Sequence, residues 1–267
     1  MIELNRIYNE DCLEGMKRIP DGSVDLTVTS PPYDNLRTYN GNIEQWNFEK
    51  FQQIAKELHR VTKHGGVVIW VVGDATVKGS ETGTSFRQAL FFQSIGFNIH
   101  DTMIYQKPAV PFDPKCNRYW QCFEYMFVFS KGKPTCNYIK EPCKNAGKQK
   151  SGDYGQKRCD GTNRTDRHDS ERVIKDDKVK DNIWFYTAGN RAKGHPAQFP
   201  EQLASDHIIS WSNPNDLVFD PFMGSGTTAK MALLNNRNYI GFELDAHYCE
   251  IANERIQKAL AEKDVGE

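Results

Sequence analysis

The sequence lacks a long apolar run and a secretion signal. No stretch approaches the roughly 18 consecutive apolar residues that cross a bilayer, and the most apolar run, Val67 to Val72, has the length of a strand. The first residues have neither the basic start nor the long apolar middle of a signal peptide. We therefore expect no membrane contact and a cytoplasmic location.

The sequence also lacks a cysteine framework. Its 7 cysteines are an odd number, and no two of them form a Cys-x-x-Cys pair. Disulfide scaffolds and zinc sites both need regular cysteine spacing, so we expect free thiols in a reducing compartment and no metal site.

The sequence also has no overall excess of positive or negative charge. Lys and Arg number 34 and Asp and Glu number 35, so the net charge of −1 excludes a wholly basic, histone-like binder. The charge is nevertheless unevenly spread, because residues 131–193 hold 16 basic and 9 acidic residues and so carry +7, against −8 for the rest. Few large apolar residues occur between 144 and 182, so this segment cannot build a core of its own. We expect it to be an insert on a main domain.

On both sides of this segment, apolar patterns alternate between strand and helix. The predicted strands are 4–8, 24–29, 67–72, 97–105, 123–129, 215–220 and 238–243. The predicted helices are 11–19, 47–61, 86–95, a helix after Pro200 to about Ser210, 226–235 and 246–260. Gly65 and Gly66 are expected to end the helical segment that precedes the strand at 67–72. The alternation predicts an α/β domain with a mostly parallel sheet.

A glycine-containing turn, Asp220-Pro-Phe-Met-Gly-Ser-Gly-Thr-Thr228, lies between a predicted strand and a predicted helix. Glycines allow a tight turn and close approach of a ligand to the free N–H groups of the helix start. Glu243 ends the next strand, where a carboxylate can accept both hydroxyls of a ribose. Asp220 would repel a pyrophosphate but suits a cofactor with an ammonium and a sulfonium group, as in S-adenosylmethionine. A plain tight turn and a nicotinamide-dependent oxidoreductase are the alternatives.

A second motif, Ser30-Pro31-Pro32-Tyr33, follows the predicted strand 24–29, at the edge where open α/β sheets bind ligands. Two consecutive prolines fix a rigid corner. The Ser30 hydroxyl and the Pro31 carbonyl can accept the two hydrogens of an exocyclic amino group, with Tyr33 beside them as a stacking surface. Two acceptors would also stabilise the positive charge that develops as such a nitrogen attacks a methyl group. An ordinary proline turn is the alternative.

The two motifs together resemble those of the amino-directed DNA methyltransferases, which modify adenine N6 or cytosine N4. Residues 29–33 resemble the family's catalytic motif and residues 219–228 its cofactor motif, and the order, catalytic motif first, resembles the β class. The resemblance implies a Rossmann-like methyltransferase fold with circularly permuted motif order and an inserted target-recognition region. Residues 1–130 would be the catalytic portion of the core, 131–193 the basic recognition insert, and 194–267 the cofactor-binding portion of the same core.

The resemblance also implies roles for single residues. The implied catalytic residues are Ser30, Pro31, Pro32 and Tyr33. The implied cofactor-binding residues are Asp11, Phe199, Asp220, Pro221, Phe222, Gly224, Ser225, Gly226, Thr227 and Glu243. Asp220 and the turn would face the methionine part of the cofactor, Glu243 the ribose and Asp11 the adenine amino group. Ser30 stands where adenine-N6 members more often have aspartate, so cytosine N4 is favoured over adenine N6.

Duplex DNA is the implied substrate, with the target base flipped out of the helix to reach the corner. The basic segment predicts contacts to phosphates. A cognate restriction endonuclease, in a restriction-modification system, is a candidate second partner, and the chain is expected to be a monomer or a homodimer. An oxidoreductase would leave the corner and the insert without a role, and an inactive DNA-binding protein is a further alternative.

Other residues carry weaker signals. Cys143 follows Pro142, as the nucleophile of cytosine-C5 methyltransferases follows a proline, but it lies in the polar insert without a strand to position it. His195 is expected to lie along the cofactor rather than to act as a base. Arg37, Tyr39 and residues 118–120 fit DNA contact and ordinary packing equally well.

Overall fold

A computed structural model describes residues 2–32, 46–108, 118–148, 173–187 and 199–264. These residues belong to two compact units, one formed by Met1–Asn137 and Asn182–Glu267, the other by Tyr138–Asp181. The second unit falls within residues 131–193. The division of the chain into two core portions and a recognition insert stays a prediction.

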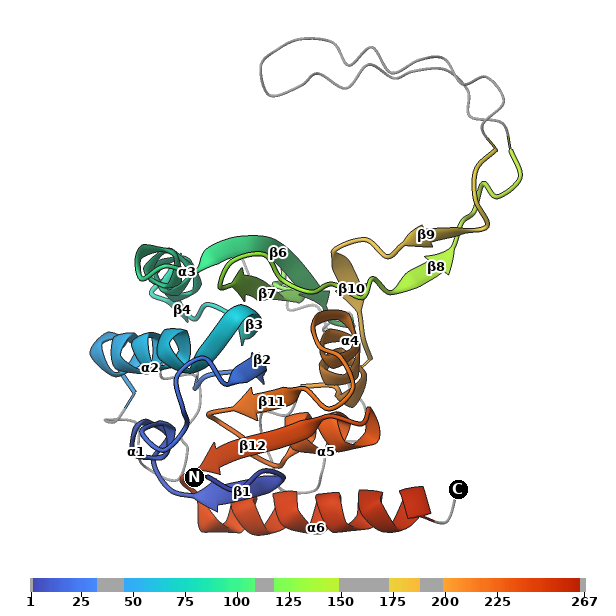
Figure 1. The fold of residues 1–267 in the computed structure, drawn as a ribbon. Coiled ribbons are helices and arrows are strands. Elements are labelled where there is room, and N and C mark those ends of the chain that lie inside the picture. Colours follow the sequence, from blue (N-terminus) through green and yellow to red (C-terminus); the bar gives the residue numbers. More distant parts are fainter. Residues whose placement is uncertain (1, 33–45, 109–117, 149–172, 188–198, 265–267) are drawn as a thin grey trace. The chain divides into compact units, whose positions relative to one another are not determined.

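An eight-stranded sheet forms the centre of the first unit (Figure 1). Its strands are β1 (Arg6–Asn9), β2 (Val24–Thr29), β3 (Thr62–Val72), β6 (Asn98–Gln106), β7 (Phe123–Ser130), β10 (Ile183–Phe185), β11 (Leu217–Asp220) and β12 (Asn238–Glu243). The order across the sheet is β1-β12-β11-β2-β3-β7-β6-β10. β7 runs antiparallel to β3 and β6, and the other neighbouring pairs of this sheet are parallel. The predicted α/β fold with a mostly parallel sheet is confirmed.

Helices cover both faces of this sheet. They are α1 (Cys12–Met16), α2 (Phe48–Val61), α3 (Thr84–Ser94), α4 (Glu201–Trp211), α5 (Thr227–Leu234) and α6 (Ala246–Asp264). The first three pack in sequence along one face and the last three along the other (Figure 1). None of the helices in the described part of the chain has the length and apolar character to cross a membrane.

The run at 67–72 forms the centre of the core. Its residues are buried, and the Trp70 ring packs against Phe51 of α2 and Phe92 of α3. The Trp70 Nε1–H donates to the Gln88 side-chain oxygen at 2.8 Å, so the polar atom of this buried ring has a partner. The expectation for Gly65 and Gly66 was wrong, because both lie inside β3. At Gly66 a Cβ atom would stand 3.0 Å from the Asp25 carbonyl oxygen, so glycine permits the close approach of the two backbones.

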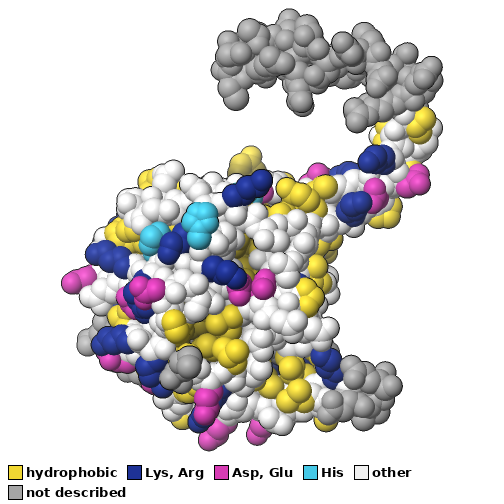
Figure 2. All heavy atoms as spheres, viewed as in Figure 1, with side chains coloured by type: hydrophobic (Ala, Val, Ile, Leu, Met, Phe, Trp, Pro, Cys, Tyr) yellow, Lys and Arg dark blue, Asp and Glu magenta, His cyan; other side chains and the backbone are white. Residues whose placement is uncertain are grey.

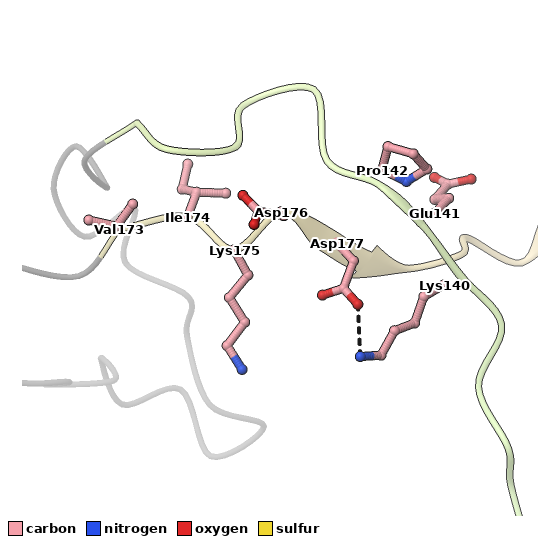
Figure 3. Close-up of a pocket in the computed structure, with 8 residues that line it drawn as sticks. All are labelled: Lys140, Glu141, Pro142, Val173, Ile174, Lys175, Asp176 and Asp177. Atoms are coloured by element: carbon pink, nitrogen blue, oxygen red, sulfur yellow. Dashed lines mark ion pairs between the residues drawn. The ribbon is translucent and has the colours of Figure 1, made fainter.

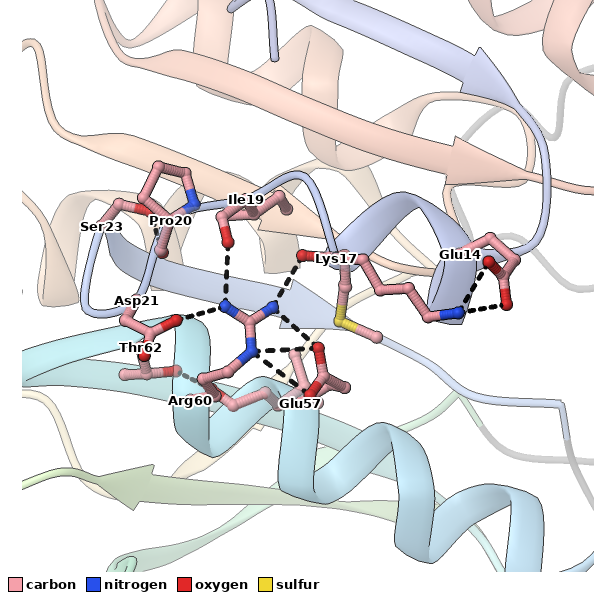
Figure 4. Close-up of polar contacts among 11 residues, drawn as sticks. Glu14, Lys17, Ile19, Pro20, Asp21, Ser23, Glu57, Arg60 and Thr62 are labelled. Carbon is pink, nitrogen blue, oxygen red and sulfur yellow. Dashed lines mark hydrogen bonds and ion pairs between the residues drawn. The ribbon is translucent and has the colours of Figure 1, made fainter. Parts of the chain in front are cut away.

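Arg60 of α2 fixes the loop between α1 and β2 (Figure 4). Its guanidinium donates to the carbonyls of Met16 at 2.7 Å and Ile19 at 2.9 Å, and to the carboxylates of Asp21 and Glu57. Carbonyls at a helix end have no partner within the helix, so a long cation from a neighbouring helix satisfies them. This anchor holds the entry to the strand whose other end carries Ser30.

Three short elements within 131–193 were not predicted. β10 joins the main sheet beside β6, with Trp184 buried between the exposed Ile183 and Phe185. In the second unit, β8 (Lys140–Pro142) pairs antiparallel with β9 (Asp177–Val179). Each of these strands has three residues, which is too short for an apolar period to show in the sequence.

Candidate active site

The two sequence motifs meet at the carboxyl edge of the sheet. β2, β11 and β12 are parallel and lie close together in the order β12-β11-β2, so the residues that follow them share one edge. The Thr29 hydroxyl at the end of β2 donates to the Asp220 carboxylate at the end of β11 over 2.6 Å. This bond joins the proline corner to the glycine turn.

Asp220 is almost fully buried, with 1% of its surface exposed. Besides Thr29, its carboxylate accepts from the Phe222 N–H at 2.9 Å and the Thr228 hydroxyl at 2.8 Å. Burial raises the pKa of Asp220 to about 7, and the nearby Glu243 charge acts in the same direction, while the hydrogen bonds oppose both. Asp220 thus holds a strand, a turn and a helix in register. Its predicted contact with the methionine end of a cofactor stays a prediction.

Glu243 is tied directly to the glycine turn. Its Oε2 accepts from the Gly224 N–H at 2.7 Å, and its Oε1 accepts from the Asp245 N–H at 2.9 Å. Burial raises the pKa of Glu243. Each oxygen uses one lone pair in these bonds and retains another, so the carboxylate fits the predicted role of accepting ribose hydroxyls.

The turn itself needs glycine at Gly226. This residue has φ +80°, and α5 begins directly after it. A Cβ atom there would lie 2.8 Å from the Ala252 Cβ atom of α6. The backbone therefore folds tightly onto α6, which leaves the N–H groups at the start of α5 next to the turn.

Asp11 has an intramolecular role in the structure. It caps α1 by accepting from the Leu13 N–H at 2.8 Å, and its other oxygen pairs with the Lys50 ammonium at 2.9 Å. Burial raises the pKa of Asp11, but the Lys50 partner and the Leu13 N–H outweigh burial, so the pKa is lowered overall. A carboxylate in this state can still accept from an amino group. Its contact with adenine stays a prediction.

Among the remaining predicted site residues, all but Tyr33 are described by the structure. Ser30 and Pro32 are half-buried, Pro31 is buried, and Tyr33 lies outside the described residues. Phe199 is half-buried and directly precedes Pro200, which caps α4. The other members of the turn, Pro221, Ser225 and Thr227, are buried, and Phe222 is half-buried.

Sequence reasoning missed an aromatic neighbour of the turn. The Phe222 ring meets the Trp46 ring edge-on, with centroids 5.4 Å apart. Trp46 stands just before Asn47, which caps α2 by accepting from the Lys50 N–H. Nothing in the sequence alone pairs a residue before one helix with a turn 176 residues later.

Residues 118–120 form an anchored surface loop. The Arg118 guanidinium donates to the Thr76 hydroxyl at 2.7 Å and the Gly79 carbonyl at 3.0 Å, in the hairpin of β4 (Thr76–Val77) and β5 (Ser80–Glu81). Tyr119 is fully exposed and Trp120 is 39% exposed. The loop precedes β7, whose Tyr125 pairs with the last residue of β3, so it lies at the carboxyl edge of that strand.

Of the other weak candidates, only Cys143 lies among the described residues. Cys143 lies in the β8–β9 unit, where its N–H donates to the Asp176 carbonyl. His195, Arg37 and Tyr39 lie outside the described residues. Within the described ranges, no group of three His, Cys, Asp or Glu side chains is placed to hold a metal ion.

The second unit carries an open hollow of about 940 Å³ (Figure 3). It is lined by Lys140, Glu141, Pro142, Val173, Ile174, Lys175, Asp176 and Asp177. Lys140 and Asp177 form an ion pair of 2.8 Å across the hairpin.

Comparison with known proteins identifies the family. A family model described as DNA methylase, for N6 and N4 methyltransferases, matches residues 24–254. The chain belongs to this family. It is 56% identical over 255 residues to the orphan methyltransferase M.BamHII of Bacillus amyloliquefaciens, covering 91% of this chain and 92% of the relative. It is also 32% identical to the type II methyltransferase M.BglII of Bacillus subtilis, covering 93% of this chain and 68% of the relative.

Solved structures agree with the fold. The PvuII DNA methyltransferase, which is cytosine-N4-specific, matches with a TM-score of 0.70 at 22% identity over 93% of this chain and 85% of its own. A protein described as a DNA modification methylase from Thermus thermophilus, complexed with S-adenosyl-L-methionine, matches with a TM-score of 0.65 at 25% identity over 95% of both chains. Family and fold confirm the predicted methyltransferase class and its cofactor, S-adenosylmethionine.

Proposed function

We propose that this methyltransferase transfers a methyl group to the exocyclic amino group of a flipped base in duplex DNA, with cytosine N4 as the favoured target. The observation that supports the proposal is the bond between Thr29 and Asp220, which joins the end of the strand before Ser30 to the start of the glycine turn. An oxidoreductase would need no acceptor corner at this point. We also propose a cytoplasmic location.

In this proposal the corner at Ser30 and Pro31 binds the target base, and the glycine turn binds the cofactor. When bound, S-adenosylmethionine supplies a methyl group on a positively charged sulfur. The Ser30 hydroxyl and the Pro31 carbonyl accept the two amino hydrogens of the target base, and Tyr33 stacks on its ring. The two acceptors orient the nitrogen lone pair and stabilise the positive charge that develops on the nitrogen. Once the methyl group is on the nitrogen and the sulfur is left as a neutral thioether, the nitrogen releases one proton to solvent, so no buried base is required.

The cofactor is held by the residues around the turn. Glu243 binds the ribose hydroxyls, Asp11 the adenine amino group, and Asp220 with residues 224–227 the methionine part. Phe199 closes the methionine end. The two N–H groups that already bind Glu243 support this arrangement, because they fix the carboxylate without using all its lone pairs.

The target base is the finer part of the proposal. Ser30 supports cytosine N4, and adenine N6 is the second candidate because the DNA adenine methyltransferase YhdJ of Escherichia coli is 26% identical over 96% of this chain. The test is to methylate mixed-sequence duplex DNA, digest it and identify the modified nucleoside. We expect N4-methylcytosine. N6-methyladenine would overturn the assignment of the base, and no modified base would overturn the reaction.

DNA contact is assigned to the basic segment and to the loop at 118–120. The fully exposed Tyr119 offers a flat surface for a base, and Arg118 holds the loop in place. In the second unit, Lys and Asp or Glu side chains alternate on the face shown in Figure 2, so part of the positive charge is paired. A monomer or homodimer and a paired restriction endonuclease stay predictions.

A further inference from the structure

We propose that Arg255 of α6 is a positioning residue that fixes the shape of the cofactor turn. One nitrogen of its guanidinium, Nη1, donates to the Ser225 carbonyl, to the Ser225 hydroxyl at 2.9 Å and to the Thr227 hydroxyl at 3.3 Å. The side chain is only 16% exposed. Arg255 thus holds the residues on both sides of Gly226. The inference rests on the proposed binding of the cofactor at this turn.

A second contact from the same helix supports this role. Ala252 and Arg255 are three residues apart and share one face of α6. Ala252 lies directly against Gly226, where no Cβ atom would fit. The turn therefore packs against Ala252 and accepts hydrogen bonds from Arg255, so two residues of α6 hold its shape.

Stabilisation of α5 does not explain why the Arg255 cation lies at the start of this helix. The start of a helix carries partial positive charge, so a cation there is unfavourable by the helix dipole. α5 also begins without a side-chain cap. Two of the three acceptors, the Ser225 carbonyl and hydroxyl, precede α5, and the third is the hydroxyl of Thr227, its first residue.

The other end of the guanidinium reaches the start of α4. Its Nη2 donates to the Glu201 carboxylate at 2.6 Å. Glu201 is the first residue of α4 and follows Phe199 by two positions. Arg255 thereby couples the turn to the start of the helix behind Phe199. The planar fork of arginine serves two groups at once, which a lysine ammonium cannot do in the same geometry.

Lys230 provides a matched control. Its ammonium binds the same Glu201 carboxylate at 2.9 and 3.0 Å, and its side chain is 22% exposed. It lies on α5, and its bonds go to Glu201 rather than to the hydroxyls of Ser225 and Thr227 that Arg255 binds. Loss of Lys230 removes an ion pair of similar burial but leaves the bonds to the turn intact.

The experiment measures two affinities for each of four proteins: wild type, Arg255→Met, Arg255→Lys and Lys230→Met. S-adenosylmethionine affinity is measured by calorimetry and DNA affinity by fluorescence anisotropy, with melting temperature recorded throughout. We expect Arg255→Met to weaken cofactor binding about tenfold or more, because several charge-assisted bonds are lost. Arg255→Lys should restore part of that loss. Lys230→Met should stay within about twofold of wild type, and DNA affinity should stay within about twofold in all variants.

Three outcomes would overturn the inference. Arg255→Met could bind cofactor as wild type does, or lose no more affinity than Lys230→Met. Alternatively, cofactor and DNA affinity could fall together with melting temperature, which would make Arg255 a general structural residue. Failure of the wild type itself to bind S-adenosylmethionine would instead count against the proposed site.

Discussion

At the scale of single residues, the carboxylates of Asp220 and Glu243 organise the backbone around the glycine turn. Asp220 and Glu243 were predicted as cofactor ligands from their places after strands. In the structure each also organises the backbone, Asp220 through Thr29 and Thr228, and Glu243 through Gly224. These partners are distant in sequence, and a motif does not specify which hydroxyl or N–H will reach a carboxylate. The role of Arg255 could not be predicted for the same reason, because only the apolar face of its helix is recognisable in the sequence.

Ser30→Ala should slow methyl transfer without weakening cofactor binding. The change removes one of two acceptors for the amino group, which costs about 1 to 3 kcal/mol when a buried donor loses its partner. The single-turnover rate should therefore fall about 5- to 160-fold. S-adenosylmethionine affinity serves as the control, since Ser30 is not among its predicted ligands. An unchanged rate would remove Ser30 from the mechanism.

Asp220→Asn should change how stability depends on pH. The pKa of Asp220 is raised from 3.8 to about 7, so the folded protein favours the protonated form. Stability from this group is fully present below pH 3.8, and it is lost as the pH rises to about 7. Asn cannot ionise, and its amide retains both an acceptor and donors for the threonine hydroxyls. The melting temperature of the variant relative to wild type should rise by about 2 °C or more between pH 5 and pH 8.

Parallel melting curves for the two proteins across that range would contradict this expectation. Glu243, whose pKa is also raised, titrates in both proteins. Because the charges of Glu243 and Asp220 interact, the difference between the two proteins reports the Asp220 carboxyl together with its coupling to Glu243.

At the scale of elements, long strands could be predicted from their apolar patterns, and strands of three residues could not. The predicted strands 24–29 and 238–243 match β2 and β12 residue for residue, because burial imposes a clear apolar pattern. β8, β9 and β10 form through pairing with distant strands, and three residues leave no period to read. The strand order likewise depends on contacts between segments, which the alternation of strand and helix does not specify.

Gly226→Ala should disturb the packing of the turn on α6. The new Cβ atom would meet Ala252 at 2.8 Å, and the backbone has φ +80°. Gly79→Ala is a matched control, since Gly79 has φ +81° but nothing within 4 Å of the added atom. Both variants carry a backbone cost of about 1 kcal/mol, and only Gly226→Ala adds a clash of about 1 to 3 kcal/mol. Chemical denaturation should show the larger loss for Gly226→Ala. Equal losses would mean that the contact with Ala252 is relaxed at no cost.

At the scale of the whole molecule, charge is the property that sequence and structure describe differently. The +7 of residues 131–193 predicted a DNA face. In the second unit, however, Lys140 pairs with Asp177 and Lys178 pairs with Glu141 and Asp181. Pairing cannot be read from counts, so the number of cations available to phosphates is smaller than the sequence total suggests.

This difference separates the lysines of the β8–β9 unit into two kinds that an experiment can compare. Lys144 and Lys175 form no ion pair with any other described residue, whereas Lys140 does. Joint replacement of Lys144 and Lys175 by alanine should weaken DNA binding and lower the slope of log affinity against log salt by about 2, because each phosphate contact releases about one counterion. Lys140→Ala should change the slope by less than half as much per residue, since its charge is already compensated. A titration of DNA affinity from low to moderate salt measures both slopes. If the double variant kept the wild-type slope, these two lysines would lie away from the DNA, and the positive charge of this unit would serve only its solvation.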